Sequence, residues 1–245
     1  MRVVVTRPEA SGLKTAELLR ERGHDPVMLP LTRPIHDSKA VASAFSKRFD
    51  TLAITSAEAI RAIVACGVDM DTIRHTTLFA VGQASANAAR SAGFENVVAG
   101  KGDGHELAQT ISDIGIERQA GTVLYLAGSV REVGFEERLC ALHIPFETVE
   151  VYGMEPVNWD RAGLEAIVSS RPIDAVLFYS SEAVRGFFDL MHRTGVQIVS
   201  AHIKFICISD KVLSLIPEPL QAKAFAARTP RETEMFDLLD RMTGT

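Results

Sequence analysis

Hydroxyl-bearing and small residues recur at one kind of position: they follow an apolar run directly ahead of a helical pattern. The residues in these turns are Thr55, Ser56, Gly82, Ser85, Ser180, Ser181 and Thr229. Ligands of open α/β sheets bind beyond the carboxyl ends of the strands, where helix N-termini present free N–H groups and a positive dipole end. The turns therefore predict a receptor for carboxylate or phosphate groups. Ser56, Ser85 and Ser181 are also ordinary N-cap residues, so helix capping is the competing interpretation.

Two arginines occupy matching places after predicted strands and supply the positive charge that such a receptor needs. Arg7 follows the first strand, and Arg131 follows a strand in the second half of the chain. An acidic protein can bind a polyanion when a few arginines are concentrated in its site. Each arginine could instead form a surface ion pair, Arg7 with Glu9 and Arg131 with Glu132.

Motifs for nucleotide cofactors, metals and protein nucleophiles are absent from the sequence. There is no Gly-x-Gly-x-x-Gly or Walker-type segment after a strand and no Gly-x-Ser-x-Gly elbow. The seven histidines show no metal-ligand spacing. The glycine-rich segment Gly100-Lys-Gly-Asp-Gly104 is interpreted as a flexible loop. We therefore expect an enzyme or binding protein that needs no cofactor and no metal.

The composition of the 245 residues, 47% hydrophobic and 23% charged, is that of a packed globular protein with room for two domains. The net charge of -5 argues against a general nucleic-acid binder. The apolar run near the N-terminus is too short for a signal peptide, and no stretch approaches a membrane span. Cys66, Cys140 and Cys207 lie in apolar stretches and are interpreted as small buried hydrophobes in a reducing cytosol. We expect a cytoplasmic protein whose partners are neither nucleic acid nor membrane.

Short apolar runs alternate with amphipathic helical patterns along the whole chain. The predicted strands are 3–6, 27–31, 51–55, 77–81, 96–99, 123–127, 146–151, 175–179, 204–208 and 222–226. The first helical pattern covers residues 12–22, with Leu13, Ala16, Leu18 and Leu19 on one apolar side. Such alternation predicts parallel sheets with right-handed crossovers, and continuous apolar strands predict sheets covered on both faces.

An internal repeat relates the two halves of the chain. The segment Asp50-Thr-Leu-Ala-Ile-Thr-Ser-Ala-Glu-Ala-Ile-Arg61 aligns without a gap with Asp174-Ala-Val-Leu-Phe-Tyr-Ser-Ser-Glu-Ala-Val-Arg185, 124 residues later. Leu78-Phe-Ala-Val-Gly82 likewise matches Phe205-Ile-Cys-Ile-Ser209. A duplicated α/β unit is the natural interpretation, and the ungapped match disfavours chance similarity.

Two proline-containing extended stretches, within residues 31–36 and 151–157, occupy the same place in each repeat. Proline fixes φ and disfavours helix before it, which suits a stiff connection between domains. Each linker, and so each domain boundary, falls inside a repeat. The opening strand–helix–strand of each repeat is therefore predicted to join the sheet of the other repeat.

The predicted architecture is two duplicated, open, parallel-sheet domains of flavodoxin-like type, joined by a two-stranded linker. One domain consists of residues 1–33 plus 157–245 and the other of residues 38–150, with linkers at 34–37 and 151–156. The first sheet should have the strand order 27–31, 3–6, 175–179, 204–208, 222–226. The two linkers should form a hinge, with Tyr152 at the floor of a cleft between the domains. If the repeats instead folded separately, strand 3–6 would pair with strand 51–55.

The chain resembles the uroporphyrinogen-III synthase family over nearly its full length. The resemblance rests on the order and spacing of motifs: Thr6-Arg7-Pro8, Asp50 through Thr55-Ser56, Val81-Gly-Gln-Ala-Ser-Ala86, Arg131-Glu132, Val151-Tyr152, Phe178-Tyr-Ser-Ser181 and Thr229-Pro230. Ser209-Asp210-Lys211 departs from the family pattern, in which Gly-Pro-Thr is common, and this puts a binding role for that turn in doubt.

The resemblance implies cyclisation of the linear tetrapyrrole hydroxymethylbilane to uroporphyrinogen III, with inversion of the D ring and loss of water. It implies a cofactor-independent lyase with two α/β domains that holds its substrate in a cleft, and we expect a monomer. A tyrosine implicated in the family matches Tyr152, the candidate catalytic residue; packing of a linker aromatic is the competing interpretation. The substrate-binding candidates are Arg7, Thr55, Ser56, Gly82, Ser85, Arg131, Ser180, Ser181 and Thr229.

Two other classes of protein remain as alternatives. A hinge-closing two-domain small-molecule binding protein would share the duplication and the two crossing linkers, but such proteins are commonly exported and the sequence shows no signal peptide. A Rossmann-like nucleotide enzyme is disfavoured by the missing glycine fingerprint.

Overall fold

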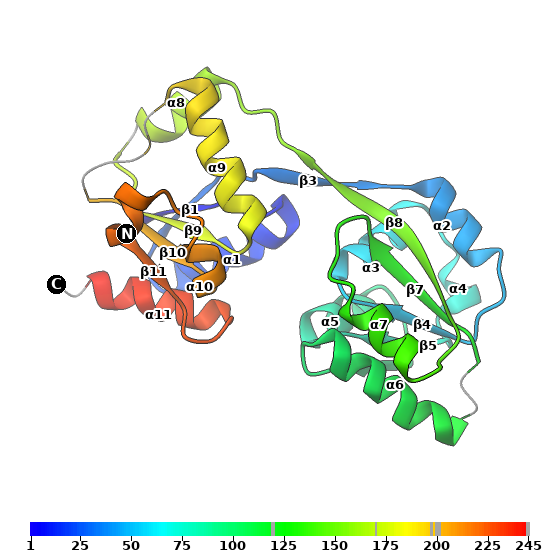
Figure 1. The fold of residues 1–245 in the computed structure, drawn as a ribbon. Helices are drawn as coiled ribbons and strands as arrows, with labels where there is room; N and C mark the ends of the chain where they lie inside the picture. Colours follow the sequence, from blue (N-terminus) through cyan, green and yellow to red (C-terminus); the bar gives the residue numbers. More distant parts are fainter. Residues whose placement is uncertain (119–120, 170, 197, 199–201, 244–245) are drawn as a thin grey trace. The chain divides into compact units, whose positions relative to one another are not determined.

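The computed structural model describes residues 1–118, 121–169, 171–196, 198 and 202–243. The chain divides into two compact units, one of Met1–Arg33 with Glu155–Thr245 and one of Pro34–Met154. We call them unit 1 and unit 2. Each unit contains an open sheet with helices on both faces, as Figure 1 shows for each. Among the described residues, no helix is both long and apolar enough to cross a membrane.

Unit 1 is built on a five-stranded parallel sheet. Its strands are β1 (Arg2–Val5), β2 (Asp25–Met28), β9 (Ala175–Phe178), β10 (Lys204–Cys207) and β11 (Ala224–Ala226). The order is β11-β10-β9-β1-β2, and Val3 of β1 aligns with Pro26 on one side and Ala175 on the other. The predicted strand order is therefore confirmed, and β1 pairs with β9 of the other repeat. The helices are α1 (Glu9–Glu21), α8 (Arg161–Ser169), α9 (Ser181–Thr194), α10 (Asp210–Leu213) and α11 (Glu232–Thr243), with a 3-10 turn at Glu218–Lys223.

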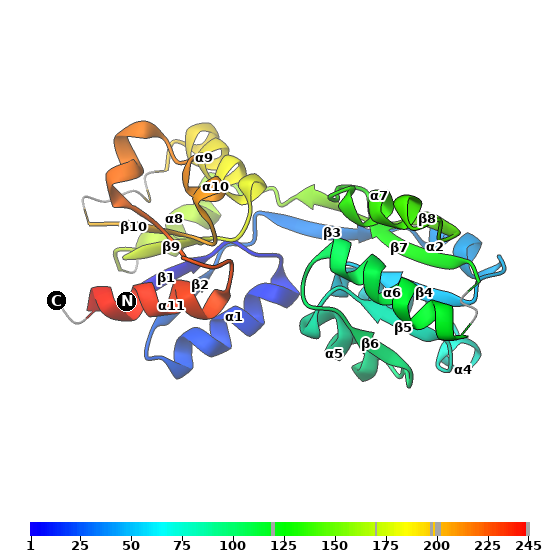
Figure 2. The same cartoon turned by 60° about the horizontal axis from the view of Figure 1, so that its bottom comes forward.

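Alternating side chains of β1 divide the core of unit 1 between the two sheet faces. Val4 packs with residues of α8 and α9, including Phe187. Val3 and Val5 pack on the opposite face with residues of α1 and α11, including Leu19. Figure 2 shows these two helix layers on either side of the unit 1 sheet. Each strand is thus covered on both faces, as the continuous apolar runs predicted.

The predicted apolar side of the first helix is partly wrong. Leu13 and Leu18 are 48% and 41% exposed, whereas Gly12, Ala16 and Leu19 are buried. A Cβ at Gly12 would lie 2.5 Å from Met28 Cε, so the helix packs closely on β2 through its smallest side chains. The buried stripe therefore follows the small residues, and the two leucines flank it.

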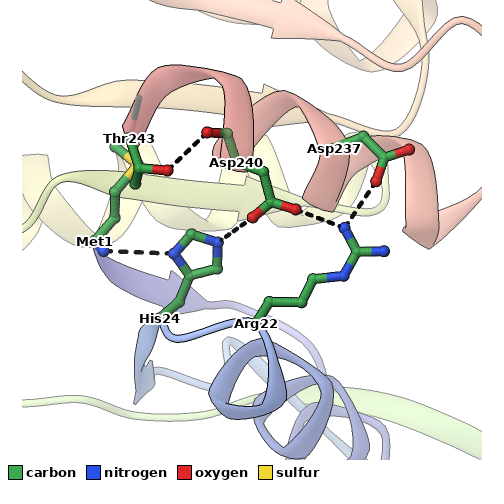
Figure 3. A network of polar contacts seen from close by, with 6 residues as sticks. All are labelled: Met1, Arg22, His24, Asp237, Asp240 and Thr243. Atoms are coloured by element: carbon green, nitrogen blue, oxygen red, sulfur yellow. Dashed lines mark hydrogen bonds and ion pairs between the residues drawn. The ribbon is translucent and has the colours of Figure 1, made fainter. Parts of the chain in front are cut away.

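A polar network joins α1 to α11 at the amino end of β2 (Figure 3). Arg22 donates to Asp237 and Asp240 at 2.7 and 2.8 Å, and His24 Nε2 lies 2.9 Å from the other Asp240 oxygen. The side chain of His24 is 2% exposed. The network ties the last helix of the chain to the first strand–helix–strand of unit 1.

Unit 2 is built on a six-stranded sheet. Its strands are β3 (Thr32–His36), β4 (Thr51–Ile54), β5 (Thr77–Ala80), β6 (Val97–Ala99), β7 (Val123–Gly128) and β8 (Phe146–Pro156), in the order β3-β8-β7-β4-β5-β6. The helices are α2 (Ser38–Phe45), α3 (Ala57–Ala65), α4 (Met70–Ile73), α5 (Gln83–Ser91), α6 (Gly104–Arg118) and α7 (Gly134–Ala141). Leu52 and Ile54 of β4 pack with α3 and α5, and Ala53 packs with α6 and α7 on the other face.

The two stretches expected to be linkers form the neighbouring strands β3 and β8. Asp37 N donates to Val151 O at 2.9 Å, and Val157 N donates to Leu31 O at 2.9 Å. As one segment advances from residue 31 to 37, the other runs back from 157 to 151, so the pair is antiparallel. The expected two-stranded connection is confirmed as a strand pair that extends the unit 2 sheet.

The cysteines are not uniformly buried as expected. Cys207 is buried in β10, Cys66 is partly buried, and Cys140 is exposed. On α7, Phe135 and Leu139 face the core at helical spacing. Cys140 follows Leu139 by one residue and points away, which the apolar composition of the segment did not reveal.

Candidate active site

A cavity of about 470 Å³ opens at the carboxyl ends of the central strands of unit 2. The segments after β4, β5 and β7 line it, together with the loop before α6 and one residue of β8. This is the edge of the sheet at which ligands of open α/β proteins bind. Four of the expected site residues meet here: Thr55, Ser56, Arg131 and Tyr152.

Tyr152 enters the cavity wall at an irregularity between β7 and β8. The register shifts between Ala127 and Gly128, and Ser129 N donates to Tyr152 O at 2.9 Å. A Cβ at Gly128 would lie 2.7 Å from Cζ of Tyr152. A larger residue at position 128 would therefore displace the phenol where it passes the end of β7.

The environment of Tyr152 raises the pKa of a phenol that is already neutral at neutral pH. Burial raises the pKa of Tyr152, the side chain of Ser56 lowers it, the charge of Glu58 raises it and that of Arg61 lowers it. The net effect is a pKa above the ordinary value of 10.0. Tyr152 can therefore donate a hydrogen bond or a proton from the cavity wall.

Thr55 is held in place by a tyrosine that the sequence interpretation missed. The hydroxyls of Thr55 and Tyr125 are 2.7 Å apart, and the Tyr125 ring packs edge-on against Phe135 at 4.8 Å. Burial is the main reason that the pKa of Tyr125 is raised. A hydroxyl-bearing aromatic within the aliphatic strand Val-Leu-Tyr-Leu-Ala was the signal available in the sequence.

Arg131 is balanced by two carboxylates, and neither is the expected Glu132. Its guanidinium donates to Glu136 at 2.9 Å, to Glu150 at 2.8 Å and to the carbonyl of Gly128 at 3.0 Å. The hydrogen bond with Glu136, followed by that with Glu150, raises the pKa of Arg131, and Arg131 lowers the pKa of Glu136 in turn. The glutamates orient the guanidinium beside the cavity and offset much of its charge.

The glycine-rich segment interpreted as a flexible loop contributes directly to the cavity. Gly102, Asp103, Gly104 and His105 line it. Asp103 accepts from His105 N at 2.6 Å and so caps the start of α6. The loop is anchored by this cap.

Gly82 and Ser85 belong to the start of α5 and are not among the residues that line this cavity. Gly82 is the N-cap, and a Cβ there would lie 3.5 Å from the Cα of Gly102. Ser85 is the third helical residue and is 6% exposed, so its interpretation as an N-cap is wrong. Glycine, not the serine, therefore occupies the capping position of α5.

Arg7 lies in unit 1, where it pairs with Glu232 and not with the expected Glu9. Arg7 Nη1 is 3.0 Å from Glu232 Oε1, and the guanidinium lies 4.4 Å from the centre of the Tyr179 ring. The hydroxyls of Tyr179 and Thr15 each donate to the same glutamate oxygen at 2.6 Å. Burial and the charge of Glu232 raise the pKa of Tyr179. Glu232 belongs to α11 and is more than 200 residues from Arg7 in the sequence, so local sequence could not indicate this ion pair.

The remaining candidates of unit 1 act as helix-start residues. Ser180 is the N-cap of α9 and accepts from Ala183 N at 3.2 Å, whereas Ser181 is the first helical residue, so its interpretation as an N-cap is wrong. Thr229 N donates to Glu234 at 2.9 Å and the Thr229 hydroxyl also contacts that carboxylate. Capping thus accounts for the contact of Ser180, whereas Thr229 is bound by the Glu234 carboxylate of α11. Across the described ranges, no group of three or more His, Cys, Asp and Glu side chains is placed to hold a metal ion.

Open α/β sheets in both units, with a cavity at the carboxyl ends of the unit 2 strands, define a two-unit α/β protein. A family model described as uroporphyrinogen-III synthase HemD matches residues 14–237. The chain belongs to the uroporphyrinogen-III synthase family. It is therefore an enzyme that forms uroporphyrinogen III in porphyrin and heme biosynthesis, a lyase acting on a small tetrapyrrole substrate.

Solved structures show the same fold at low sequence identity. A crystal structure of uroporphyrinogen-III synthetase from Helicobacter pylori 26695 aligns with a TM-score of 0.66 at 13% identity, covering 99% of this chain and 100% of that one. A mutant uroporphyrinogen III synthase from the extremely thermophilic bacterium Thermus thermophilus aligns with a TM-score of 0.53 at 16% identity, covering 100% and 99%. A search of curated proteins found no significant match to this sequence.

Proposed function

We propose that the unit 2 cavity binds part of the linear substrate hydroxymethylbilane and that Tyr152 is its proton donor. The observation that carries this proposal is the position of Tyr152, a neutral phenol in the wall of a cavity that Thr55, Ser56 and Arg131 also line. Membership of the family gives the reaction, formation of uroporphyrinogen III, and the cavity contains hydroxyl and guanidinium groups suited to that reaction.

In the proposed reaction the bond between the hydroxymethyl carbon and its oxygen breaks, and the oxygen leaves as water after accepting a proton. The electron pair of the adjacent pyrrole nitrogen stabilises the resulting azafulvene cation. For D-ring inversion, the D-ring carbon that carries the methylene bridge bonds to the cation and its bond to the bridge then breaks. The bridge carbon bonds to the free α carbon of the D ring, and loss of the proton from that carbon restores the proton balance. The protein must therefore protonate the leaving oxygen, orient the chain and exclude water.

A tyrosine with a pKa above its usual value is a weak general acid, so orientation must contribute strongly. Well-oriented intramolecular reactions gain roughly 7–11 kcal/mol relative to their bimolecular counterparts. The fixed hydroxyls of Thr55 and Ser56 and the oriented guanidinium of Arg131 are suited to holding a multiply carboxylated substrate. We propose these three as substrate-binding residues.

The other substrate-binding candidates are proposed on the family resemblance: Arg7, Gly82, Ser85, Ser180, Ser181 and Thr229. For Arg7, a substrate carboxylate would have to compete with Glu232. We also propose that residues 34–37 and 151–156 form a hinge between domains of residues 1–33 plus 157–245 and 38–150. The three unpaired cysteines support a reducing compartment, the cytoplasm, and we propose a monomer, which size-exclusion chromatography with light scattering would test.

The test of the proposed reaction is product analysis. The pure protein is incubated with freshly prepared hydroxymethylbilane, the products are oxidised, and the porphyrin isomers are separated by chromatography. We expect the type III isomer, and formation of type I alone, as in the spontaneous reaction, would contradict the proposal. The hinge-closing binding protein is not favoured, because the family model covers most of the chain.

A further inference from the structure

The duplication places the same short motif at the start of two helices, one in each unit. Ser56-Ala-Glu-Ala-Ile-Arg61 opens α3, and Ser180-Ser-Glu-Ala-Val-Arg185 opens α9. In both copies the serine is the N-cap. The glutamates, Glu58 and Glu182, therefore start from equivalent local structure, and any difference between them comes from the rest of the molecule.

The two glutamates have very different surroundings. The side chain of Glu182 is 63% exposed and lies 3.8 Å from Arg185, an ordinary surface pair. The side chain of Glu58 is only 10% exposed and is ion-paired to Arg61. His36 of β3 adds a contact of 2.8 Å from its Nε2 to Glu58 Oε1. A carboxylate withdrawn from water and bound on both sides is costly to keep unless its partners hold it precisely in place.

Two structural routes lead from Glu58 to Tyr152. Ser56, the N-cap of α3, accepts from the backbone N–H of Glu58 at 3.1 Å and lines the same cavity as Tyr152, whose pKa it lowers. The second route runs through His36. Its neighbour Asp37 donates from the backbone to Val151, the residue before Tyr152, at 2.9 Å. The Glu58 carboxylate thus ties α3, whose N-cap is Ser56, to β3, the strand that pairs with the one carrying Tyr152.

We propose that Glu58, held between His36 and Arg61, is a positioning residue for Tyr152 that fixes the phenol in the cavity wall during the reaction. The inference rests on the proposed role of Tyr152 as proton donor. Glu58 is not among the residues that line the cavity, so it acts through Ser56 and β3. Glu182, in the equivalent position of unit 1, has no such task.

The first measurement is steady-state kinetics of Glu58→Gln, His36→Ala and the matched control Glu182→Gln. We expect Glu58→Gln and His36→Ala to lower kcat roughly tenfold with little change in KM, because a displaced phenol affects the reaction more than binding. His36→Gln, which keeps an N–H donor, should restore most of the loss, and Glu182→Gln should behave like the parent. Parent-like kcat in both Glu58→Gln and His36→Ala would overturn the inference, as would an equal loss in Glu182→Gln.

A second measurement follows the tyrosine itself and needs no substrate. The charged groups that act on its ionisation are Glu58 and Arg61 of α3; His36 of β3 binds Glu58, and Arg131 lines the same cavity. The protein has three tyrosines, so ¹³Cζ-tyrosine NMR gives three signals, and Tyr152→Phe assigns one. We expect Glu58→Gln to lower the pKa of Tyr152, because a negative charge is removed, and His36→Ala to leave that charge in place.

The two measurements together separate position from acidity. A lower pKa makes Tyr152 a better acid, so a fall in kcat in Glu58→Gln must come from lost orientation. Adding Glu58→Gln to Tyr152→Phe should lower kcat no further than Tyr152→Phe alone, and an additive loss would overturn the inference. Parent-like kcat in Tyr152→Phe would instead refute the proposed function, while an unmoved Tyr152 signal in Glu58→Gln would show that Glu58 does not act on the phenol.

Discussion

Among single residues, Tyr152 carries the proposed chemistry, because its hydroxyl is the proposed proton donor. Burial and the nearby Glu58 raise the pKa of Tyr152, and the Ser56 hydroxyl and Arg61 partly oppose them. A phenol in this setting remains a donor throughout the physiological range. Its contribution can be measured by removing the oxygen alone.

Tyr152→Phe should lower kcat about 10²-fold, the lower end of what general acid–base groups contribute, and leave the fold intact. The ring stays and only the hydroxyl is lost, so the packing of β8 should persist. Turnover with hydroxymethylbilane measures the first effect and circular dichroism the second. Unchanged kinetics in a folded variant would assign Tyr152 to packing.

At the scale of elements, the junction of β7 and β8 determines where the phenol lies. Gly128 ends β7 opposite Tyr152, where the register shifts, and Ser129 bonds back to the Tyr152 carbonyl. Irregular pairing of this kind re-aims a side chain that a regular ladder would direct elsewhere. The lack of a side chain at Gly128 is what makes room for the ring.

Gly128→Ala should displace the phenol and lower kcat by up to about 10²-fold, because the new methyl group would lie 2.7–2.9 Å from three atoms of Tyr152. The clash is with the end of a side chain, so the protein should still fold, at a cost of roughly 1–3 kcal/mol. Gly12→Ala is the control, since its methyl group would meet Met28 in unit 1. The midpoint temperature of thermal unfolding and kcat should both fall in Gly128→Ala. An equal loss of kcat in Gly12→Ala would contradict the explanation that the effect is local to Tyr152.

At the scale of the whole molecule, two copies of one α/β unit have become different. The residue equivalent to Thr55 of unit 2 is Tyr179 of unit 1, whose hydroxyl is bound to Glu232 together with Arg7. In unit 2 the corresponding end of the sheet carries a cavity lined by hydroxyls. The two units therefore share one backbone architecture, and they differ in the side chains at the ends of their strands.

The stability of the whole chain should fall steeply above about pH 10. Burial raises the pKa of Tyr125, Tyr152 and Tyr179 in the folded protein above the ordinary value of 10.0. A raised folded pKa contributes stability that is present below pH 10 and is lost as the pH rises toward the folded value, because the unfolded chain has then released those protons. Urea denaturation from pH 8 to 11 measures this dependence. Tyr179→Phe should reduce the slope, and an unchanged slope in that variant would contradict the assignment.

Activity should persist after exhaustive chelation and dialysis. The substrate's own pyrrole stabilises the cation formed when water leaves, and the sequence shows no metal-ligand spacing. The measurement is turnover before and after treatment with a chelator. Loss of activity that returns on adding a divalent metal would refute this expectation.

Local sequence patterns were enough to predict the order of elements, the parallel pairing of most strands and the exchange of strands between repeats. Each of these follows from local pattern: apolar runs specify strands, and proline-containing stretches inside both repeats predict that β1 pairs with β9, as it does. The same patterns brought Thr55, Ser56, Arg131 and Tyr152 to one cavity, because the carboxyl ends of parallel strands share an edge.

The partners of individual side chains, in contrast, depend on how the elements pack. Glu58 and Glu182 occupy the same position in the repeated motif. His36 of β3 nevertheless binds Glu58, whereas Glu182 lies at the surface. Local sequence likewise could not show that Arg7 would bind Glu232 of α11. Burial and charge pairing depend on segments that are distant in the chain and adjacent only after folding, so the partners of these groups follow from the packed sheet and not from spacing.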